Sequence, residues 1–127
     1  GIGEAPFKAG ICASGMYDLA PVLLSARSSY VKMDKAEEHA LSPMRHLDRV
    51  NCPIVVAYGD GESPEFKRQG RDFAAALKAK VRHKSQLVEC AGMNHFEVAL
   101  SLADPTGILG RIALDQMAAP LAVPLAE

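Results

Sequence analysis

The apolar run at residues 54–58 constrains the fold more than any other part of the sequence. Both of its alternating sets of side chains are apolar, and Pro53 and Gly59 bound it, which predicts a short strand buried on both faces. Strands of this kind occur mostly in parallel sheets that helices cover. The run therefore predicts an α/β fold.

Apolar runs and helical patterns alternate along the rest of the chain. Residues 7–13 and 85–90 are predicted strands, and an irregular insert separates the first of them from the run at 54–58. Helix starts are indicated at Ser42-Pro43, at Ser63-Pro64 with a helix to about residue 80, near residue 96, and at Asp104-Pro105 with a helix to about residue 117. This order implies a parallel sheet with right-handed crossovers.

Side-chain patterns predict which surfaces are buried. Phe66, Phe73 and Leu77 fall on one face of the helix that follows Ser63, and we expect the charged residues of this helix to face water. The pair Glu37-Glu38 is expected to be a solvated face as well.

The composition fits one soluble globular domain. The 127 residues are 49% apolar and 23% charged, and a net charge of −1 argues against a nucleic-acid partner. No apolar run is long enough to cross a membrane, and no signal-peptide pattern is visible, so no membrane partner is expected. Cys12, Cys52 and Cys90 do not have metal-site spacing, and we expect reduced thiols in a cytoplasmic protein.

The two ends of the chain differ from its middle. The first residues enter an apolar run almost at once, which indicates a fragment or one chain of a cleaved protein. We expect one unit at residues 1–117, followed by a tail rich in Pro and Ala at residues 118–127 that packs loosely or contacts a partner.

Two predicted loops carry residues that could perform catalysis. Glu62 follows the strand that ends at Gly59, and His95 follows the strand that ends near residue 90. A helix and a returning parallel strand separate them, so both loops should lie at the same edge of the sheet, where such sheets place functional residues. A carboxylate there could orient the imidazole, whose other nitrogen would act as a general base. Asp60 is a rival for the role of the acid.

Several motifs add a family resemblance. Residues 52–59 (CPIVVAYG), followed by an acid and then by residues 92–96 (GMNHF), resemble the C-terminal part of α/β-hydrolases. Residues 15–19 (GMYDL) and 62–69 (ESPEFKRQ) are similar to the arylformamidase (kynurenine formamidase) and esterase branch. That branch usually has Asp where this chain has Glu62.

The resemblance implies a Ser-acid-His triad in which Glu62 is the acid and His95 is the base. The sequence contains no Gly-x-Ser-x-Gly elbow, and Ser14 lacks the glycine two residues before it. A His-Gly-Gly oxyanion loop does not occur either. In the family both belong to the preceding half, so we expect the sheet to be incomplete without an N-terminal half. A companion polypeptide carrying the nucleophile elbow is the implied partner.

The leading interpretation is therefore the C-terminal half of a serine hydrolase that cleaves a small carboxylic ester or an N-formyl aryl amide. The alternative is a non-catalytic α/β-hydrolase-like domain for binding or scaffolding. The reaction requires no metal and no organic cofactor. Met93, Phe96 and Leu23 are candidates for the wall of the substrate pocket, with core packing as the other interpretation.

Overall fold

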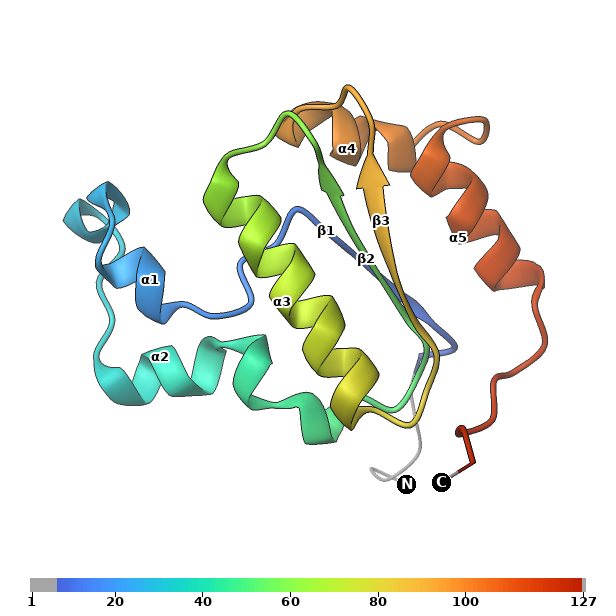
Figure 1. The fold of residues 1–127 in the computed structure, drawn as a ribbon, viewed down its shortest axis with the longest axis horizontal. Helices are drawn as coiled ribbons and strands as arrows, with labels where there is room; N and C mark the ends of the chain where they lie inside the picture. Colours follow the sequence, from blue (N-terminus) through green and yellow to red (C-terminus); the bar gives the residue numbers. More distant parts are fainter. Residues whose placement is uncertain (1–6, 127) are drawn as a thin grey trace.

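The computed structural model describes residues 7–126 and contains a three-stranded parallel sheet (Figure 1). The strands, in their order across the sheet, are β1 (Gly10–Ala13), β2 (Ile54–Gly59) and β3 (Ser85–Cys90). In the register, Ile11 is opposite Val55, and Val56 is opposite Leu87. The predicted α/β class and the parallel sheet are confirmed.

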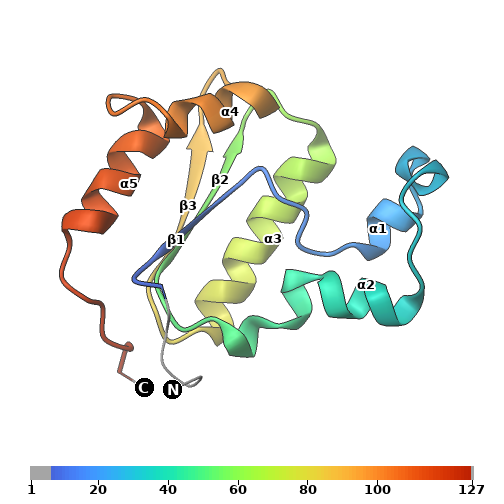
Figure 2. The same cartoon turned by 180° about the vertical axis from the view of Figure 1, so that it is seen from behind.

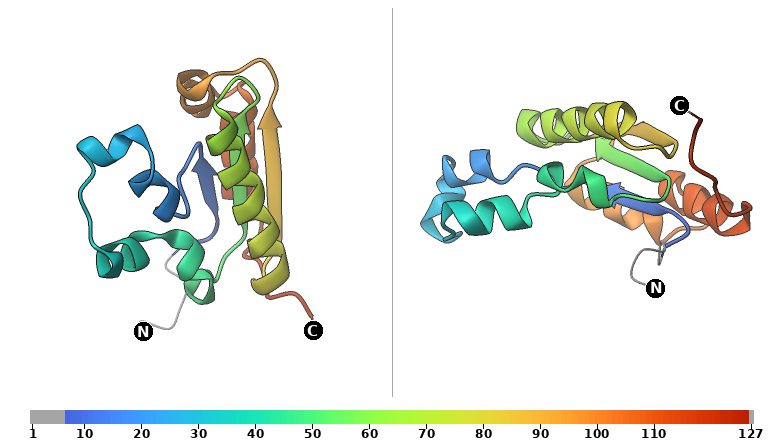
Figure 3. Two further views of the ribbon diagram at one scale, coloured as in Figure 1. Left: turned by 60° about the vertical axis from the view of Figure 1, so that its left-hand side comes forward. Right: turned by 90° about the horizontal axis from the view of Figure 1, so that it is seen from below.

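Helices cover both faces of this sheet (Figure 3). They are α3 (Pro64–Lys80) on one face, and α4 (His95–Leu102) and α5 (Ile108–Ala118) on the other. Successive side chains of a strand point to opposite faces, so neighbouring residues of β2 belong to different cores. Val56 packs with Leu77 of α3, whereas Ala57 packs with Val98 and Leu109.

The insert between β1 and β2 lies beyond the β1 side of the sheet (Figure 2). Its short elements are α1 (Ala20–Leu23), the 3₁₀ turn η1 (Ala26–Ser29), α2 (Lys35–Leu41), and the 3₁₀ turns η2 (Pro43–Arg45) and η3 (Leu47–Arg49). Gln69 of α3 joins the insert to the core. Its buried side chain accepts hydrogen bonds from the backbone N–H groups of Tyr17 and Asp18, and it donates to Asp18 O and to Glu65.

A helix does begin at Ser42-Pro43 as predicted, but it is only a short 3₁₀ turn. The chain forms the turns η2 and η3 there, and the Ser42 hydroxyl caps neither of them. The hydroxyl instead accepts a hydrogen bond from Leu19 N and donates to Glu38. Glu38 is not a solvated residue as predicted, because it is buried and also accepts hydrogen bonds from Arg45. Tertiary hydrogen bonds thus replace the helical cap.

Two boundaries also differ from the sequence prediction. The first strand begins at Gly10 rather than at residue 7. The last helix begins at Ile108 rather than at 104–105, because the Asp104 carboxylate accepts hydrogen bonds from Thr106 N and Oγ1 and holds a turn. The helix α3 does begin after Ser63, although the Ser63 side chain makes no capping hydrogen bond.

The remaining segments add few contacts. Residues 119–126 are irregular and exposed, and Leu125 N donates a hydrogen bond of 2.5 Å to Arg82 O.

Over residues 7–126, no helix is both long enough and apolar enough to cross a membrane. All three cysteines are unpaired thiols; Cys52 and Cys90 are buried, and Cys12 is partly buried.

Candidate active site

The loops that follow β2 and β3 lie side by side at the carboxyl edge of the sheet. Asp60 N donates a hydrogen bond to Cys90 O (3.1 Å), and Gly61 N donates to Met93 O (3.1 Å). In return, Gly92 N donates to the Asp60 carboxylate (2.8 Å). These bonds fix the backbone of one loop against that of the other, so the side chains they carry have defined relative positions.

Glycine permits this close approach at the end of β2. A Cβ atom on Gly59 would lie 2.1 Å from Met93 O, far closer than non-bonded atoms can come. Gly92 serves the other loop differently, since its φ of +71° lies in the left-handed region that glycine adopts without strain. The two glycines therefore have separate roles: Gly59 lets the two loops approach each other, and Gly92 lets the backbone turn.

Glu62 lies at the centre of the site, and its side chain is fully buried. Its Oε2 accepts hydrogen bonds from Gly59 N (2.7 Å) and from Ser14 Oγ (2.7 Å). Its Oε1 lies 2.6 Å from His95 Nδ1. Burial by itself raises the pKa of Glu62, but the hydrogen bonds from Gly59, His95 and Ser14 together outweigh it and hold that pKa below its usual value. The carboxyl group is therefore ionised at neutral pH.

His95 is the first residue of α4, where the cap of this helix fixes its backbone. The Asn94 side chain accepts hydrogen bonds from Phe96 N and Glu97 N, and the Glu97 side chain accepts one from Asn94 N. This capping box sets the direction in which α4 leaves the loop. Because Nδ1 of His95 faces a carboxylate, it carries the proton, and Nε2 makes no hydrogen bond within residues 7–126. That second nitrogen is available for proton transfer.

A cavity of about 410 Å³ opens beside the histidine. The His95 ring packs between Phe66 (centroids 4.8 Å apart) and Phe96 (5.7 Å), and the side chain remains 48% exposed. The Arg27 guanidinium lies over the Phe66 ring, 5.3 Å from its centroid. The cavity therefore combines aromatic surface, a basic imidazole and one cationic group.

Known proteins resemble this chain in sequence. No protein-family model matches it. The kynurenine formamidase of Salmo salar is 33% identical over 117 residues, which are 87% of this chain and 39% of that protein. The kynurenine formamidase of Danio rerio is 32% identical over 114 residues, covering 84% of this chain and 38% of the relative. The chain thus spans about two fifths of the length of these curated relatives.

Solved structures resemble it in fold. A putative thioesterase from a Silicibacter species superposes with a TM-score of 0.71 at 27% identity, over 82% of this chain and 37% of the other. An acylaminoacyl peptidase from Pyrococcus horikoshii gives a TM-score of 0.69 at 18% identity, over 99% and 22% of the two chains. The chain has the α/β-hydrolase fold over the part of those proteins that it matches.

Within this α/β-hydrolase fold, the structure brings Glu62 and His95 together and keeps Asp60 apart. The Asp60 side chain turns toward Gly92 N instead of the imidazole. Of the predicted pocket residues, Phe96 lines the cavity beside the histidine. Met93 packs against the buried cluster of Ala57, Cys90, Val98 and Leu109, and Leu23 lines a different hollow, within the insert.

Sequence reasoning missed three residues of the candidate site. Ser14 was considered only as a nucleophile, and Phe66 only as part of an apolar helix face. No sequence pattern indicated Arg27. It is far from His95 in the sequence, and only the folding of the insert brings it to the same cavity. The position of Phe66 in the first turn of α3, close to Glu62, could have indicated that it faces the loops rather than the sheet.

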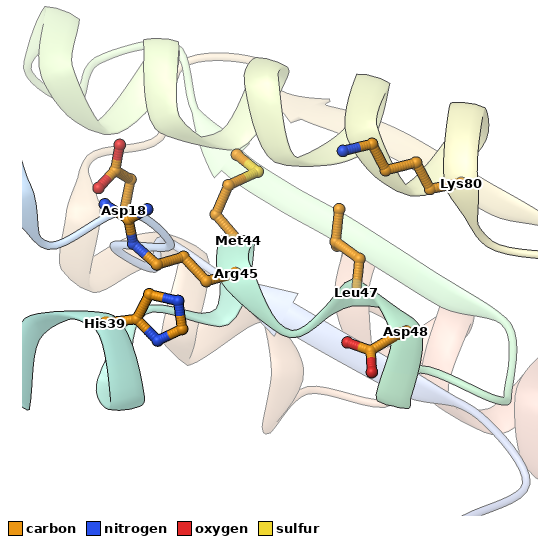
Figure 4. A pocket seen from close by; sticks show the side chains of 7 residues that line it. All are labelled: Asp18, His39, Met44, Arg45, Leu47, Asp48 and Lys80. Atoms are coloured by element: carbon orange, nitrogen blue, oxygen red, sulfur yellow. The ribbon is translucent and has the colours of Figure 1, made fainter. Parts of the chain in front are cut away.

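A second hollow of about 450 Å³ lies between the insert and α3 (Figure 4). Its lining includes Asp18, His39 and Arg45 from the insert and Lys80 from α3. The Arg45 side chain donates a hydrogen bond to Glu38. None of its lining residues belongs to the cavity beside His95. Over the described part of the chain, no group of three or more His, Cys, Asp or Glu side chains could hold a metal ion.

Proposed function

We propose that this chain supplies the acid and the base of a serine hydrolase. The observation that carries the proposal is the hydrogen bond of 2.6 Å between the buried Glu62 carboxylate and His95 Nδ1, next to a cavity that His95 lines. A buried acid on one imidazole nitrogen and an available second nitrogen are what the general base of a serine hydrolase needs.

In the proposed reaction, a serine hydroxyl attacks the carbonyl carbon of the substrate while His95 Nε2 takes the hydroxyl proton. The C–O or C–N bond to the leaving group then breaks, and the same nitrogen returns the proton to that group. Water repeats the sequence on the acyl-enzyme and releases the acid. Glu62 keeps the proton of the imidazole on Nδ1 and stabilises the imidazolium that forms in each step.

The nucleophile belongs to another part of the assembled enzyme, which we call the companion polypeptide. The sequence contains no nucleophile elbow, and the Ser14 hydroxyl is engaged with Glu62 rather than with His95. In the described sheet β1 is an edge strand, and unpaired edges of this kind accept a further strand. A companion that extends the sheet next to β1 would place its own loops at the same carboxyl edge.

The proposed substrate is a small carboxylic ester or an N-formyl aryl amide. Support comes from the names of the relatives, kynurenine formamidase in Salmo salar and Danio rerio and a putative thioesterase in a Silicibacter species, since formamides and thioesters are both acyl compounds. The aromatic rings of Phe66 and Phe96 beside His95 suit an aryl leaving group.

A fluorophosphonate probe tests this proposal on the complete protein, purified with whatever polypeptide accompanies this chain. Such probes react with a serine that a histidine activates. We expect intact-mass spectrometry to find the adduct on a polypeptide segment other than this one. The substitution His95→Ala should abolish labelling, whereas the control His39→Ala, in the hollow of Figure 4, should label like the wild type.

Two results would overturn the proposal. Labelling of the His95→Ala variant at the wild-type rate would remove His95 from the mechanism. The absence of any label on the wild-type protein would favour a non-catalytic domain for binding or scaffolding.

A further inference from the structure

Ser14 has an unusual backbone at the end of β1. Its N–H donates a hydrogen bond to Ala57 O (2.8 Å), which continues the pairing with β2. Its φ is +53°, and it is the only residue other than glycine with a positive φ over residues 7–126. Residues other than glycine are disfavoured in the left-handed region of positive φ. The contacts that Ser14 makes must therefore offset the strain.

The Ser14 hydroxyl makes one such contact. Its Oγ donates a hydrogen bond of 2.7 Å to Glu62 Oε2, a residue 48 positions further along the chain. Glu62 Oε2 also accepts a hydrogen bond from Gly59 N. Hydrogen bonds to an ionised group are stronger than those between neutral groups. The left-handed backbone of Ser14 thus turns its hydroxyl toward the acid of the site.

The two carboxylate oxygens of Glu62 have different partners. The terminal torsion of a Glu side chain is broad, so an unrestrained carboxylate rotates easily about it. Two donors on Oε2 hold this rotation, and Oε1 is then directed at His95 Nδ1. The backbone donor Gly59 is only three residues from Glu62, whereas Ser14 belongs to a distant segment, directly after β1.

We propose that Ser14 is a positioning residue for the acid: its hydroxyl holds Glu62 in the orientation that presents Oε1 to His95. This inference rests on the function proposed above. Ser14 touches no reacting atom. It acts through Glu62, which in turn orients the imidazole.

A purely structural role in the turn is the alternative explanation. The neighbouring Gly15 supports it, since a Cβ atom there would lie 2.8 Å from the Tyr17 ring, so this turn is already tightly packed. If the turn alone mattered, glycine would suit position 14 better than serine, because it adopts a positive φ without strain. The substitution Ser14→Gly therefore separates the two explanations.

Three variants of the complete protein form the test. Ser14→Gly and Ser14→Ala both remove the hydroxyl, and we expect each to lower kcat about 10-fold with little change in KM. Ser14→Gly relieves the backbone strain, so it should unfold at a higher urea concentration than Ser14→Ala. Ser14→Thr keeps the hydroxyl at the price of a β-branched side chain at positive φ; it should be less stable than Ser14→Ala and yet more active.

Activity that follows the hydroxyl and not the stability supports the proposal. Wild-type kcat in Ser14→Gly would overturn it. So would a kcat in folded Ser14→Thr as low as that of Ser14→Ala. If Ser14→Thr does not fold, the comparison of Ser14→Gly with the wild type decides alone.

A spectroscopic measurement does not depend on activity. The proton on His95 Nδ1, hydrogen-bonded to a carboxylate, should give a low-field NMR resonance that is lost in His95→Ala. We expect this resonance to move upfield or broaden in Ser14→Gly; no change in its position or width would count against Ser14. The proposed function fails separately, when His95→Ala hydrolyses substrate as the wild type does.

Discussion

The substitution Glu62→Gln is the sharpest test of the site, because the structure dictates how the new amide must lie. Oε2 of Glu62 accepts hydrogen bonds from Gly59 N and Ser14 Oγ, and an amide nitrogen cannot accept them. The amide oxygen of Gln must therefore take that place, which turns its NH₂ group toward His95 Nδ1. The imidazole then has to accept at Nδ1 and to carry its proton on Nε2.

The consequence is a histidine in the wrong tautomer. Nε2 is the nitrogen that should take the proton of the attacking serine, and in the variant it is already protonated. The corresponding carboxylate-to-amide change in a serine protease triad lowers kcat about 10⁴-fold. We expect a loss of the same order here, about 5.5 kcal/mol of transition-state stabilisation at 1.36 kcal/mol per tenfold change. KM should change little, because Glu62 orients the base and does not bind the substrate.

The assay is steady-state hydrolysis of an aryl ester by the complete protein, together with ¹⁵N NMR of the His95 ring, which reports the tautomer. Asp60→Asn is the matched control, since it makes the same carboxylate-to-amide change two residues away. The Asn carbonyl oxygen can still accept the hydrogen bond from Gly92 N. We expect kcat of this control to remain within about twofold of the wild type, as for a neutral hydrogen-bond replacement.

Two outcomes would refute the reasoning. If Glu62→Gln kept more than about a tenth of the wild-type kcat, the acid would not be controlling the tautomer of a catalytic base. If Asp60→Asn lost more activity than Glu62→Gln, the acid would be the rival residue, and the pairing of Glu62 with His95 would have another purpose.

Three further predictions concern the scaffold of the site. Gly59→Ala should lower the free energy of unfolding by about 3 kcal/mol, because the new Cβ would clash with Met93 O. Gly92→Ala should lower it by only about 1 kcal/mol, because the new Cβ has open space around it and only the positive φ is unfavourable. Equal urea midpoints for the two variants would contradict this. Gln69→Ala should cost about 2–4 kcal/mol in the same assay, since it leaves buried backbone N–H groups of the insert unpaired, and a loss below about 0.5 kcal/mol would show that water replaces the amide. The folded-state pKa of Glu62 is lowered, so its contribution to stability is complete above about pH 4.5 and is lost as the pH falls through that lowered value. The stability of the wild type should therefore fall more steeply than that of Glu62→Gln below pH 4.5, and parallel curves would exclude a lowered pKa.

Local patterns were enough to predict much of the fold. The run at 54–58 predicted β2 to within one residue, and Ser63-Pro64 marked the start of α3. Proline and glycine act on the backbone of their own residue, so these signals survive without tertiary context. Ser42-Pro43 also marked a helix start, but the Ser42 hydroxyl forms hydrogen bonds with Leu19 and Glu38 instead of capping the 3₁₀ turn that begins there. Nothing local distinguishes those two uses of a serine.

The candidate site was predictable to the same extent. That an acid and a histidine would meet at the carboxyl edge followed from strand order alone, because the right-handed crossover brings consecutive parallel strands side by side. Which acid would face the histidine did not follow. Asp60 and Glu62 are two residues apart, and only the turn after Gly59 decides that Glu62 points inward and Asp60 toward Gly92.

The sequence by itself therefore determined the α/β class, the order of the strands and the two loops that carry chemistry, since each depends on residues close together in the chain. Only the tertiary structure decided that Ser14 would hold Glu62 and that Phe66 and Arg27 would lie beside His95. These contacts join segments from different strands and from the insert. Their geometry depends on how the backbones pack within a few tenths of an ångström, and a pattern of residue types along one chain does not carry that information.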